Sequence, residues 1–480
     1  MGIVFVPFYV RLMGVESYGI IGVFISLVGV LTVLDLGLSQ SLNREMAKLS
    51  SDGKNGQRMV DTVRTLEGVY WAVAMLVGVV VTLLAKPIAN YWLNPETLTV
   101  GDLLQALWVM GLVIALRWPV SLYMGGLNGL QRQVQVNILL SIFATLQGLG
   151  ALLVLWFIAP TIQAYFFWQA AVALAQVAVF RVALLRNLPR GHRGTFNRRV
   201  FREIWHFAAG MSGISVLGMI LTQMDKVLLS KLLTLTEFGY YTFATTVAAA
   251  LFRLIGPVFT AYYPRLTELV SRKDEPGLVR TYHQGSQLMA IVIFPAAFVL
   301  ALFSKEILMV WTHDPNVVQH ASLLISLLTI GNALNGLMTM PYALQLAHGQ
   351  TKLAIYQNIV AVTLLVPALY FAAYHWRGVG AAVTWIALNI GYFLISVSIM
   401  HRGLLPNEKW NWYKNDVLKL SAPALGICII GRIIYPDNTS AILSTFVIAF
   451  VSGLALIATF MSANLLRNQW SLTRRHACNE

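Results

Sequence analysis

Apolar residues occur in long runs along the whole chain, and short polar or basic segments separate the runs. Most runs extend over about 20 residues, the length that an α-helix needs to cross a bilayer. Because backbone groups in hydrocarbon must be satisfied within the protein, we expect each run to be helical. The pattern predicts an all-α polytopic membrane protein with about 14 membrane helices, the first too short to cross, at residues 1–12, 18–40, 67–86, 103–127, 136–158, 162–185, 206–231, 239–263, 287–311, 319–347, 354–374, 379–401, 418–435 and 441–463.

The pattern repeats at an offset of about 220 residues. The stretch 15–49 returns in altered form at 235–269, and single residues such as Gly129 and Gly349 match at the same offset. A fixed long offset indicates a duplicated unit. We therefore predict two six-helix bundles of the same orientation, related as a parallel repeat. The predicted segments are an N-terminal bundle at 1–185, a basic cytoplasmic linker at 186–205, a second bundle at 206–401, two extra helices at 402–463 and a cytoplasmic tail at 464–480.

The repeat also bears on the start of the chain. It aligns Met1 with Leu221, which lies in the middle of the seventh span. The first helix is therefore expected to be incomplete by about 15 residues, and a start codon assigned too late is the favoured explanation.

Composition and charge agree with a membrane protein. Hydrophobic residues make up 57% of the chain and charged residues only 11%, whereas a soluble protein of this length exposes far more charge. With the loop after the second span on the cytoplasmic side, 24 of the 34 Lys and Arg residues face the cytoplasm, six face the opposite side and four lie within spans. This asymmetry predicts a multi-pass protein of the cell (inner or plasma) membrane with a cytoplasmic C-terminus.

Several other classes are disfavoured. Topology accounts for the net charge of +14, so no nucleic-acid partner is expected. Extramembrane stretches reach at most about 26 residues, and the chain has no Walker A, GxSxG or HExxH motif. Two cysteines and nine scattered histidines support neither a disulfide framework nor a metal site. We expect no enzymatic activity, no cofactor and no metal.

Ionisable side chains inside spans are costly and are therefore candidate functional residues. Arg117, Arg253 and Lys226 are predicted to line a cationic cavity between the bundles and to bind an anionic substrate, because a guanidinium donates two hydrogen bonds to phosphate. Asp35 and Asp225 are ion-coupling candidates that could take up a proton or hold a sodium ion. A structural interpretation stays open, in which Asp35 pairs with Arg253 across the bundles and a basic neighbour neutralises Asp225.

Four basic residues occur in repeat-equivalent cytoplasmic pairs. Arg44 corresponds to Arg265, and Arg132 corresponds to Lys352. They are candidates for a cytoplasmic rim that collects phosphate groups, although topology alone would keep basic residues there.

Other residues in or near spans favour structural roles. Glu67 and Arg181 lie near span ends, and we expect them to reach toward the membrane interface. Gly125, Gly126 and Gly129 are expected to permit close packing of helices.

Several stretches of the chain resemble a known family. PFYVRLMGVESYGIIGV, followed by LDLGLSQSLNREMA, is similar to the opening of the polysaccharide (O-antigen type) flippases, and TQMDKVLLSKLLTLTEFGYYTFA is similar to the start of their second half. GLNGLQRQVQVN and LAHGQTKLAIYQN resemble their paired cytoplasmic turns. The resemblance covers residues 1 to about 400, and the order and spacing of the motifs carry it.

The resemblance implies a MATE-like fold, shared with multidrug extruders and the lipid II flippase. The implied function is translocation of a polyprenyl-pyrophosphate-linked oligosaccharide from the cytoplasmic to the outer leaflet, by ion-coupled alternating access. The implied partners are this lipid-linked substrate, a coupling ion (H⁺ or Na⁺), membrane lipid, and a polysaccharide polymerase or export machinery.

Three alternatives stay open at this point. A multidrug or cation extruder would share the fold but should have an acidic cavity. A membrane glycosyltransferase or polymerase would normally need a large outer loop with carboxylates, and the outer loops here are short. A non-transporting scaffold of an export complex would be distinguished by a transport assay.

Overall fold

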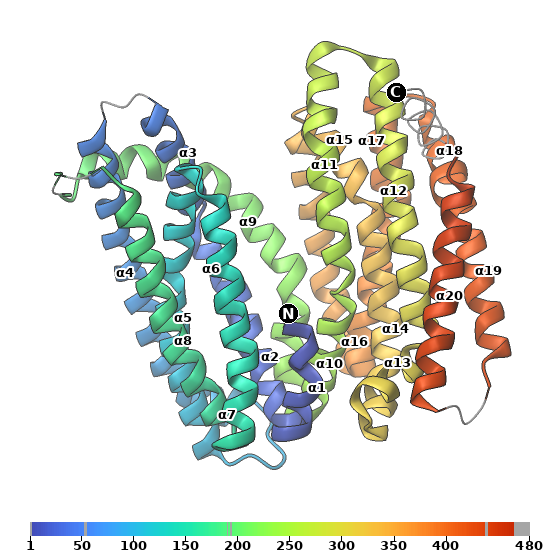
Figure 1. Ribbon diagram of the computed structural model, residues 1–480, viewed down its shortest axis with the longest axis horizontal. Coiled ribbons are helices and arrows are strands. Elements are labelled where there is room, and N and C mark those ends of the chain that lie inside the picture. The colour runs from blue at the N-terminus through green and yellow to red at the C-terminus, as the bar shows by residue number, and fades with distance from the viewer. Residues whose placement is uncertain (1, 52–54, 190, 193, 437–439, 465–480) are drawn as a thin grey trace, which may run out of the picture. The chain divides into compact units, whose positions relative to one another are not determined.

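Helices joined by short turns make up nearly all of the described chain, which contains no β-strand (Figure 1). A computed structural model describes residues 2–51, 55–189, 191–192, 194–436 and 440–464. The helical form follows from the apolar runs, because a helix satisfies its backbone groups internally where no water is available. The predicted all-α polytopic class is confirmed.

Eleven helical segments in the described residues are long and apolar enough to cross a membrane. Each contains at least part of a predicted span, and the count of 14 stays a prediction. The segments are Val15–Asp35, Gly56–Trp92, Val100–Gly129, Gln133–Phe157, Ile162–Asn187, Leu235–Arg272, Glu275–Leu302, Pro315–Ala347, Ile355–Leu404, Glu408–Ile434 and Ala441–Ser462.

The chain divides into two units, residues 1–239 and 240–480, and the division falls within helix α10 (Leu235–Ala248). The predicted bundles instead end at residue 185 and begin again at 206. Those boundaries stay a prediction.

Unit 1 has its core where α5 packs against α3, α4 and α8. Buried side chains such as Leu42, Leu66, Tyr123 and Phe180 fill this core. The elements of unit 1 are α1 (Gly2–Met13), α2 (Val15–Leu31), η1 (Thr32–Asp35), α3 (Leu38–Ser51), α4 (Gly56–Pro87), η2 (Ile88–Trp92), α5 (Val100–Gly129), α6 (Gln133–Thr145), η3 (Leu146–Gly150), α7 (Ala151–Phe157), α8 (Ile162–Asn187) and α9 (Arg198–Leu232).

A break interrupts the second predicted span, 18–40. The α-helix α2 ends at Leu31, η1 follows as one 3₁₀ turn, and the backbone then turns at Leu36 (φ 49°) and Gly37 (φ 77°). Both residues adopt the left-handed region, which is costly for leucine and easy for glycine. The chain resumes as α3, so the expected single helix is in fact two helices with Asp35 at the break.

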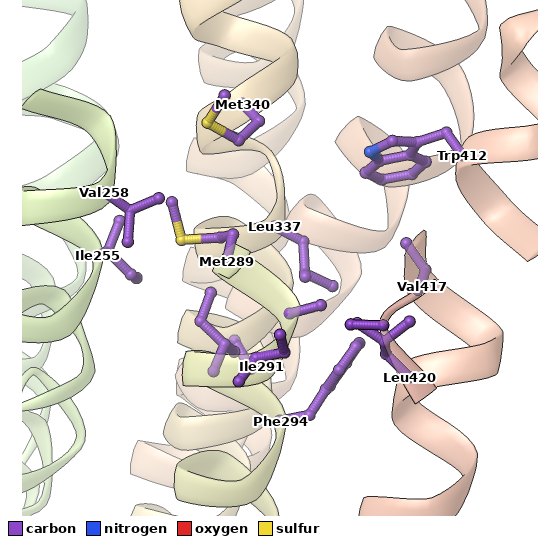
Figure 2. Close-up of a cluster of buried hydrophobic side chains, with 14 of the residues drawn as sticks. Ile255, Val258, Met289, Ile291, Phe294, Leu337, Met340, Trp412, Val417 and Leu420 are labelled. Atoms are coloured by element: carbon purple, nitrogen blue, oxygen red, sulfur yellow. The ribbon is translucent and has the colours of Figure 1, made fainter. Parts of the chain in front are cut away.

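Unit 2 has its core around α12, which packs against α11, α14 and α19. Figure 2 shows Met289, Ile291 and Phe294 of α12 in the same cluster as Trp412 and Leu420. The remaining elements are α11 (Leu251–Arg272), α12 (Glu275–Leu302), α13 (Ser304–Thr312), α14 (Pro315–Leu337), α15 (Thr339–Ala347), α16 (Thr351–Gly391), η4 (Tyr392–Ser396), α17 (Val397–Leu404), α18 (Glu408–Asn411), η5 (Trp412–Leu418), α19 (Lys419–Ile434) and α20 (Ala441–Ser462).

The predicted linker at 186–205 is hydrogen-bonded to α4. The backbone N–H and hydroxyl of Thr195 donate to the carboxylate of Asp61 at 2.8 and 3.2 Å. The N–H of Asn197 donates to the hydroxyl of Thr65 at 2.9 Å. Specific contacts therefore hold this part of the linker against unit 1, in addition to any attraction of its basic residues to lipid.

Candidate functional site

Arg117 lies in α5 with its charge directed into unit 1. Its Nη2 donates to Oε1 of Gln169 on α8 at 2.6 Å, and its guanidinium carbon lies 5.5 Å from the ring centroid of Phe24 on α2. The side chain of Gln169 is fixed in turn, because its Nε2 donates to the carbonyl of Gln147 at 3.2 Å. Three different elements thus position one guanidinium.

The same guanidinium is incompletely satisfied. Its Nε is buried and has no hydrogen-bond partner among the described residues, and no described carboxylate forms an ion pair with Arg117. A buried charge without a partner is costly and is expected only where a ligand or ion can compensate it. The predicted substrate residue is therefore in a state that suits binding of an anion.

Asp35 lies at the break between α2 and α3 and is surrounded by hydroxyl groups. Ser39 donates to its carboxylate at 2.8 Å, Ser121 of α5 donates at 3.4 Å, and Tyr70 of α4 also donates to it. In the described chain no basic side chain pairs with it. A carboxylate with neutral oxygen neighbours can bind a proton or a small cation, and broken helices often form such sites.

Asp225 and Lys226 neighbour one another in α9. The ammonium of Lys226 lies 3.5 Å from the carboxylate of Asp225 and donates to the carbonyl of Thr222 at 2.9 Å. The two charges largely compensate each other. This arrangement fits the structural interpretation that the sequence left open for Asp225.

Arg253 is exposed near the start of α11, just after the turn that separates α10 from α11. No described carboxylate pairs with its side chain. In a membrane-spanning segment an exposed guanidinium needs water, a lipid phosphate or a ligand. Its predicted role in substrate binding stays a prediction.

The four predicted rim residues are not brought together by described contacts. Arg44 and Arg132 are exposed, in α3 and just before α6. Arg265 is exposed in α11 and forms an ion pair with Glu268 at 2.6 Å. The side chain of Lys352 lies outside the described residues.

Glu67 behaves differently from the sequence expectation of a residue reaching toward the interface. Its carboxylate is buried in unit 1 and accepts from Arg64 at 2.6 Å, from Arg181 at 2.5 Å and from the hydroxyl of Tyr123 at 2.8 Å. Arg181 likewise points to this carboxylate. Burial of a charge is tolerated here because two guanidinium groups and a hydroxyl satisfy it.

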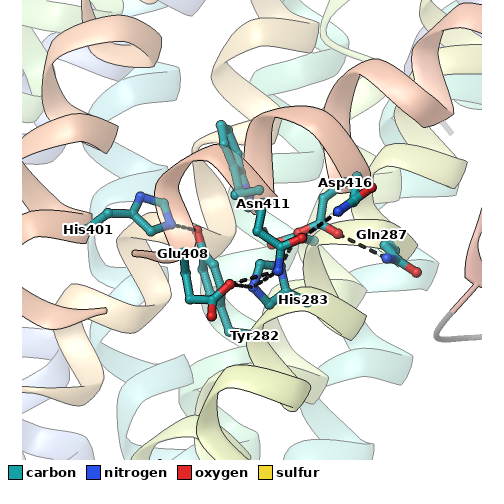
Figure 3. Close-up of polar contacts among 10 residues, drawn as sticks. Tyr282, His283, Gln287, His401, Glu408, Asn411 and Asp416 are labelled. Carbon is teal, nitrogen blue, oxygen red and sulfur yellow. Dashed lines mark hydrogen bonds and ion pairs between the residues drawn. The ribbon is translucent and has the colours of Figure 1, made fainter. Parts of the chain in front are cut away.

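A second polar cluster in unit 2 was missed by the sequence reasoning. His283 of α12 lies between two carboxylates, those of Asp416 in η5 and Glu408 in α18 (Figure 3). The residues lie 125 and 133 positions apart in the chain, so no local motif marks them. The only signal was the presence of carboxylates in the segment before a predicted extra helix.

These features describe a multi-pass membrane protein: its helices are long and apolar enough to cross a bilayer, and a small number of charged groups lie inside them. No group of three or more His, Cys, Asp or Glu side chains suited to a metal ion occurs among the described residues.

Comparison with known proteins identifies the family. The profile of the family described as "Polysaccharide biosynthesis protein" matches residues 1–270, more than half of the chain, so the chain belongs to this family. It is 23% identical over 384 residues to a Shigella flexneri protein named "Putative O-antigen transporter", and the match covers 79% of this chain and 88% of that one.

Solved structures show the same fold. The lipid II flippase MurJ, in an inward closed conformation, superimposes with a TM-score of 0.72 at 12% identity over 97% of both chains. An inward-facing multidrug transporter of the MATE family superimposes with a TM-score of 0.65 at 12% identity, over 83% of this chain and 94% of that one. The predicted MATE-like fold is confirmed, and these relatives are transporters rather than enzymes.

Proposed function

We propose that the protein is a flippase for a polyprenyl-pyrophosphate-linked oligosaccharide, such as an O-antigen or exopolysaccharide repeat unit. It moves this substrate from the cytoplasmic to the outer leaflet of the cell membrane by alternating access. Membership in the polysaccharide biosynthesis family and the similarity to a protein named for O-antigen transport support the substrate class.

The state of Arg117 is the observation that carries this proposal. A partly buried guanidinium with an unsatisfied Nε and no described carboxylate partner is suited to an anion. Pyrophosphate matches it well, because phosphate oxygens accept the paired hydrogen bonds that a guanidinium donates. A cationic drug would be repelled by the same group, which argues against a multidrug extruder.

The physical need for such a site is clear. A sugar–pyrophosphate head group loses its water if it enters hydrocarbon unaided, at a cost of many kcal/mol for the charges alone. Polar and cationic side chains on helices replace this hydration while the polyprenyl tail stays in the lipid. Arg117, Arg253 and Lys226 are proposed to act in this way, and Arg44, Arg132, Arg265 and Lys352 to collect phosphate groups at the cytoplasmic rim.

We further propose that an ion gradient drives transport through Asp35. Its hydroxyl neighbours and the absence of a described basic partner suit exchange of H⁺ or Na⁺. Asp225 is the weaker candidate, because Lys226 already compensates its charge. A cytoplasmic C-terminus and cooperation with a polysaccharide polymerase or export machinery complete the proposal.

Complementation of a flippase-deficient strain tests the proposal. Wild type should restore surface polysaccharide on gels, and Arg117→Gln should reduce it by at least about tenfold, the effect of losing a charge-assisted hydrogen bond. Arg117→Lys should retain part of the activity, because it keeps the positive charge but lacks the paired N–H donors of a guanidinium. Asp35→Asn should abolish the dependence of export on the ion gradient.

Arg272→Gln is the matched control. Arg272 is an exposed arginine that pairs with Glu268 at 2.9 Å and has no proposed contact with substrate, so export should be unchanged. Membrane levels of all variants are compared by blotting. A well-expressed wild type that restores nothing would contradict the flippase proposal, whereas full export by Arg117→Gln would remove Arg117 from the binding site.

A further inference from the structure

The buried imidazole of His283 contacts a carboxylate with each of its ring nitrogens (Figure 3). Nδ1 lies against the carboxylate of Asp416, and Nε2 lies 3.0 Å from Oε2 of Glu408. The side chains of His283 and Asp416 are only 3% and 1% exposed, and that of Glu408 is 26% exposed. These three groups, with the amides described below, are called the His283 cluster.

The geometry fixes how many protons the His283 cluster holds. A neutral imidazole has one N–H and one lone pair, so it can donate to only one of the two carboxylates. The other ring nitrogen would then face a carboxylate oxygen with no hydrogen between them. A neutral imidazole with two ionised carboxylates is therefore one proton short of the observed arrangement. The additional proton can reside on the ring or on one of the two carboxyl groups.

Two amides complete the cluster. Gln287 donates to Oδ1 of Asp416 at 3.0 Å, and Asn411 donates to Oε2 of Glu408 at 2.7 Å. The amide nitrogen of Asn411 also lies 3.4 Å from Nε2 of His283. Both amides act as donors to carboxylates, so they hold the acidic groups in place and supply no proton of their own.

Other titratable or charged groups around His283 come from its own helix and from the segments packed against it. The ring of Tyr282 lies 5.4 Å from that of His283, and the hydroxyl of Tyr282 contacts Nε2 of His401 in α17 at 3.2 Å. Nδ1 of His401 donates to the carbonyl of Val397 at 2.9 Å. Glu275 and Arg280 of α12 line the same pocket as His283, and Lys409 and Tyr413 lie on α18 and η5, the elements that carry Glu408 and Asp416.

The His283 cluster is accessible from the surface of unit 2. A shallow pocket of about 520 Å³ is lined by Glu275, Pro276, Val279, Arg280, His283 and Asn411. Water in this pocket would reach the imidazole and the Asn411 amide directly. A proton can therefore exchange with bulk water while the Asp416 side chain stays buried.

The His283 cluster joins two separate parts of the chain. His283 and Gln287 belong to α12 in the centre of unit 2, whereas Glu408, Asn411 and Asp416 belong to α18 and η5. Another polar contact between these parts is made by the indole of Trp412, which donates to Ser286 at 3.1 Å. The charged contacts around one imidazole thus attach both α18 and η5 to α12.

We propose that the His283 cluster is a proton-binding site that clasps α18 and η5 onto α12. With its proton bound the clasp is closed. When the proton leaves to water, one ring nitrogen still donates to its carboxylate, but the other presents a lone pair to the second carboxylate and repels it, so the segment from Leu404 to Leu418 opens. On the predicted topology this end of α12 faces the cytoplasm, so the clasp responds to cytoplasmic pH. The inference does not depend on the transported substrate.

Hydrogen exchange of the purified full-length protein in lipid nanodiscs tests the clasp. Exchange is measured by mass spectrometry from about pH 6 to pH 9, the range in which histidine sites commonly titrate, and is corrected for the intrinsic pH dependence. Protection of residues 404–418 should fall by at least about tenfold as pH rises, since a tenfold change corresponds to about 1.4 kcal/mol. Protection of α14 should not change.

Three variants make the test specific. His283→Gln should leave 404–418 weakly protected at every pH, without a transition. Glu408→Gln places an amide N–H within reach of Nε2, so a neutral imidazole can donate to Asp416 and accept from the amide, and 404–418 should stay protected across the whole pH range. His375→Gln is the control, because His375 is exposed and its hydrogen bond to the carbonyl of Phe371 and its ring contacts all lie within its own helix.

Two results would overturn the proposal. One is unchanged protection of 404–418 in wild type across the pH range. The other is a Glu408→Gln variant that loses protection equally at all pH values, which would indicate a purely structural role. Because Glu408 is partly exposed, this variant is expected to fold even if His283→Gln does not.

Discussion

Individual charges in this protein differ mainly in whether they have partners. Glu67 is buried and accepts hydrogen bonds from Arg64, Arg181 and Tyr123, so its charge is compensated within unit 1. Arg117 is only partly buried, yet its buried Nε is unsatisfied and its guanidinium has one amide partner. The first arrangement stabilises the fold, and the second leaves a charge available to a ligand.

Glu67→Gln should therefore destabilise unit 1. Arg64 and Arg181 donate to different oxygens of Glu67, and the amide replaces one of these oxygens with an N–H donor, so one of the two arginines loses its acceptor. We expect a loss of about 1–3 kcal/mol, because Arg64 and Arg181 are half-exposed and recover some hydration. The measurement is the midpoint of thermal unfolding in detergent.

Glu268→Gln is the comparison for this prediction. Glu268 pairs with Arg265 and Arg272 on the exposed face of α11, where water replaces the lost contact. Its unfolding midpoint should match wild type. Equal midpoints for the two variants would show that the Glu67 contacts add nothing beyond an exposed ion pair.

Sequence reasoning found the charges that stand alone in apolar runs but not their partners. Arg117 could be selected because an arginine within a span is conspicuous by itself. The His283 cluster could not, because His283 and Asp416 meet only through the packing of α12 against η5 and α19. Glu67 was assigned to the interface because its position in the span was visible, whereas Arg181 folding back onto it was not.

Pairs of helices in unit 1 approach closely where glycines face a neighbouring backbone. A Cβ atom on Gly125 would meet the backbone of Ser39, and one on Gly129 would meet the backbone of Asn43. The two glycines are four residues apart and so lie on one face of α5. They bring α3 against α5, and α3 begins directly after the break that holds Asp35.

Gly129→Ala should therefore lower stability and disturb the Asp35 site together. The added methyl group meets a backbone carbonyl, which cannot rotate away as a side chain can, and such overpacking costs about 1–3 kcal/mol. The unfolding midpoint in detergent gives the stability. Export in the complemented strain, normalised to membrane level, gives the effect on function.

Gly68→Ala is the control for this prediction, because it adds the same methyl group to a helix of unit 1. Gly68 lies in α4 with no atom near enough to touch a new methyl group, so the change should be neutral or slightly stabilising. If Gly129→Ala were as stable as Gly68→Ala, close packing would not explain the glycine. The glycines themselves were foreseen from sequence, but the break at Leu36 was not, because apolar residues lie on both sides of Asp35 and the stretch matches a single span.

At the scale of the whole molecule, orientation in the membrane decides what each site can sense. The fold and the family are established, but the side of each loop rests on the distribution of Lys and Arg. The clasp responds to cytoplasmic pH only if the turn before α18 faces the cytoplasm. The same charge pattern places the turn between α7 and α8 on the opposite side.

Single cysteines at two exposed turn positions test this orientation. In a background of Cys428→Ser and Cys478→Ser, Pro160→Cys should react with a membrane-impermeant maleimide in intact spheroplasts. Asn407→Cys should react only after permeabilisation, because the positive-inside asymmetry keeps its loop in the cytoplasm. The reverse labelling pattern would mean that the protein has the opposite orientation in the membrane and that the His283 cluster faces the outer pH. Labelling of both positions in intact cells would mean that the number of spans between them is even, against the odd number that the sequence predicts.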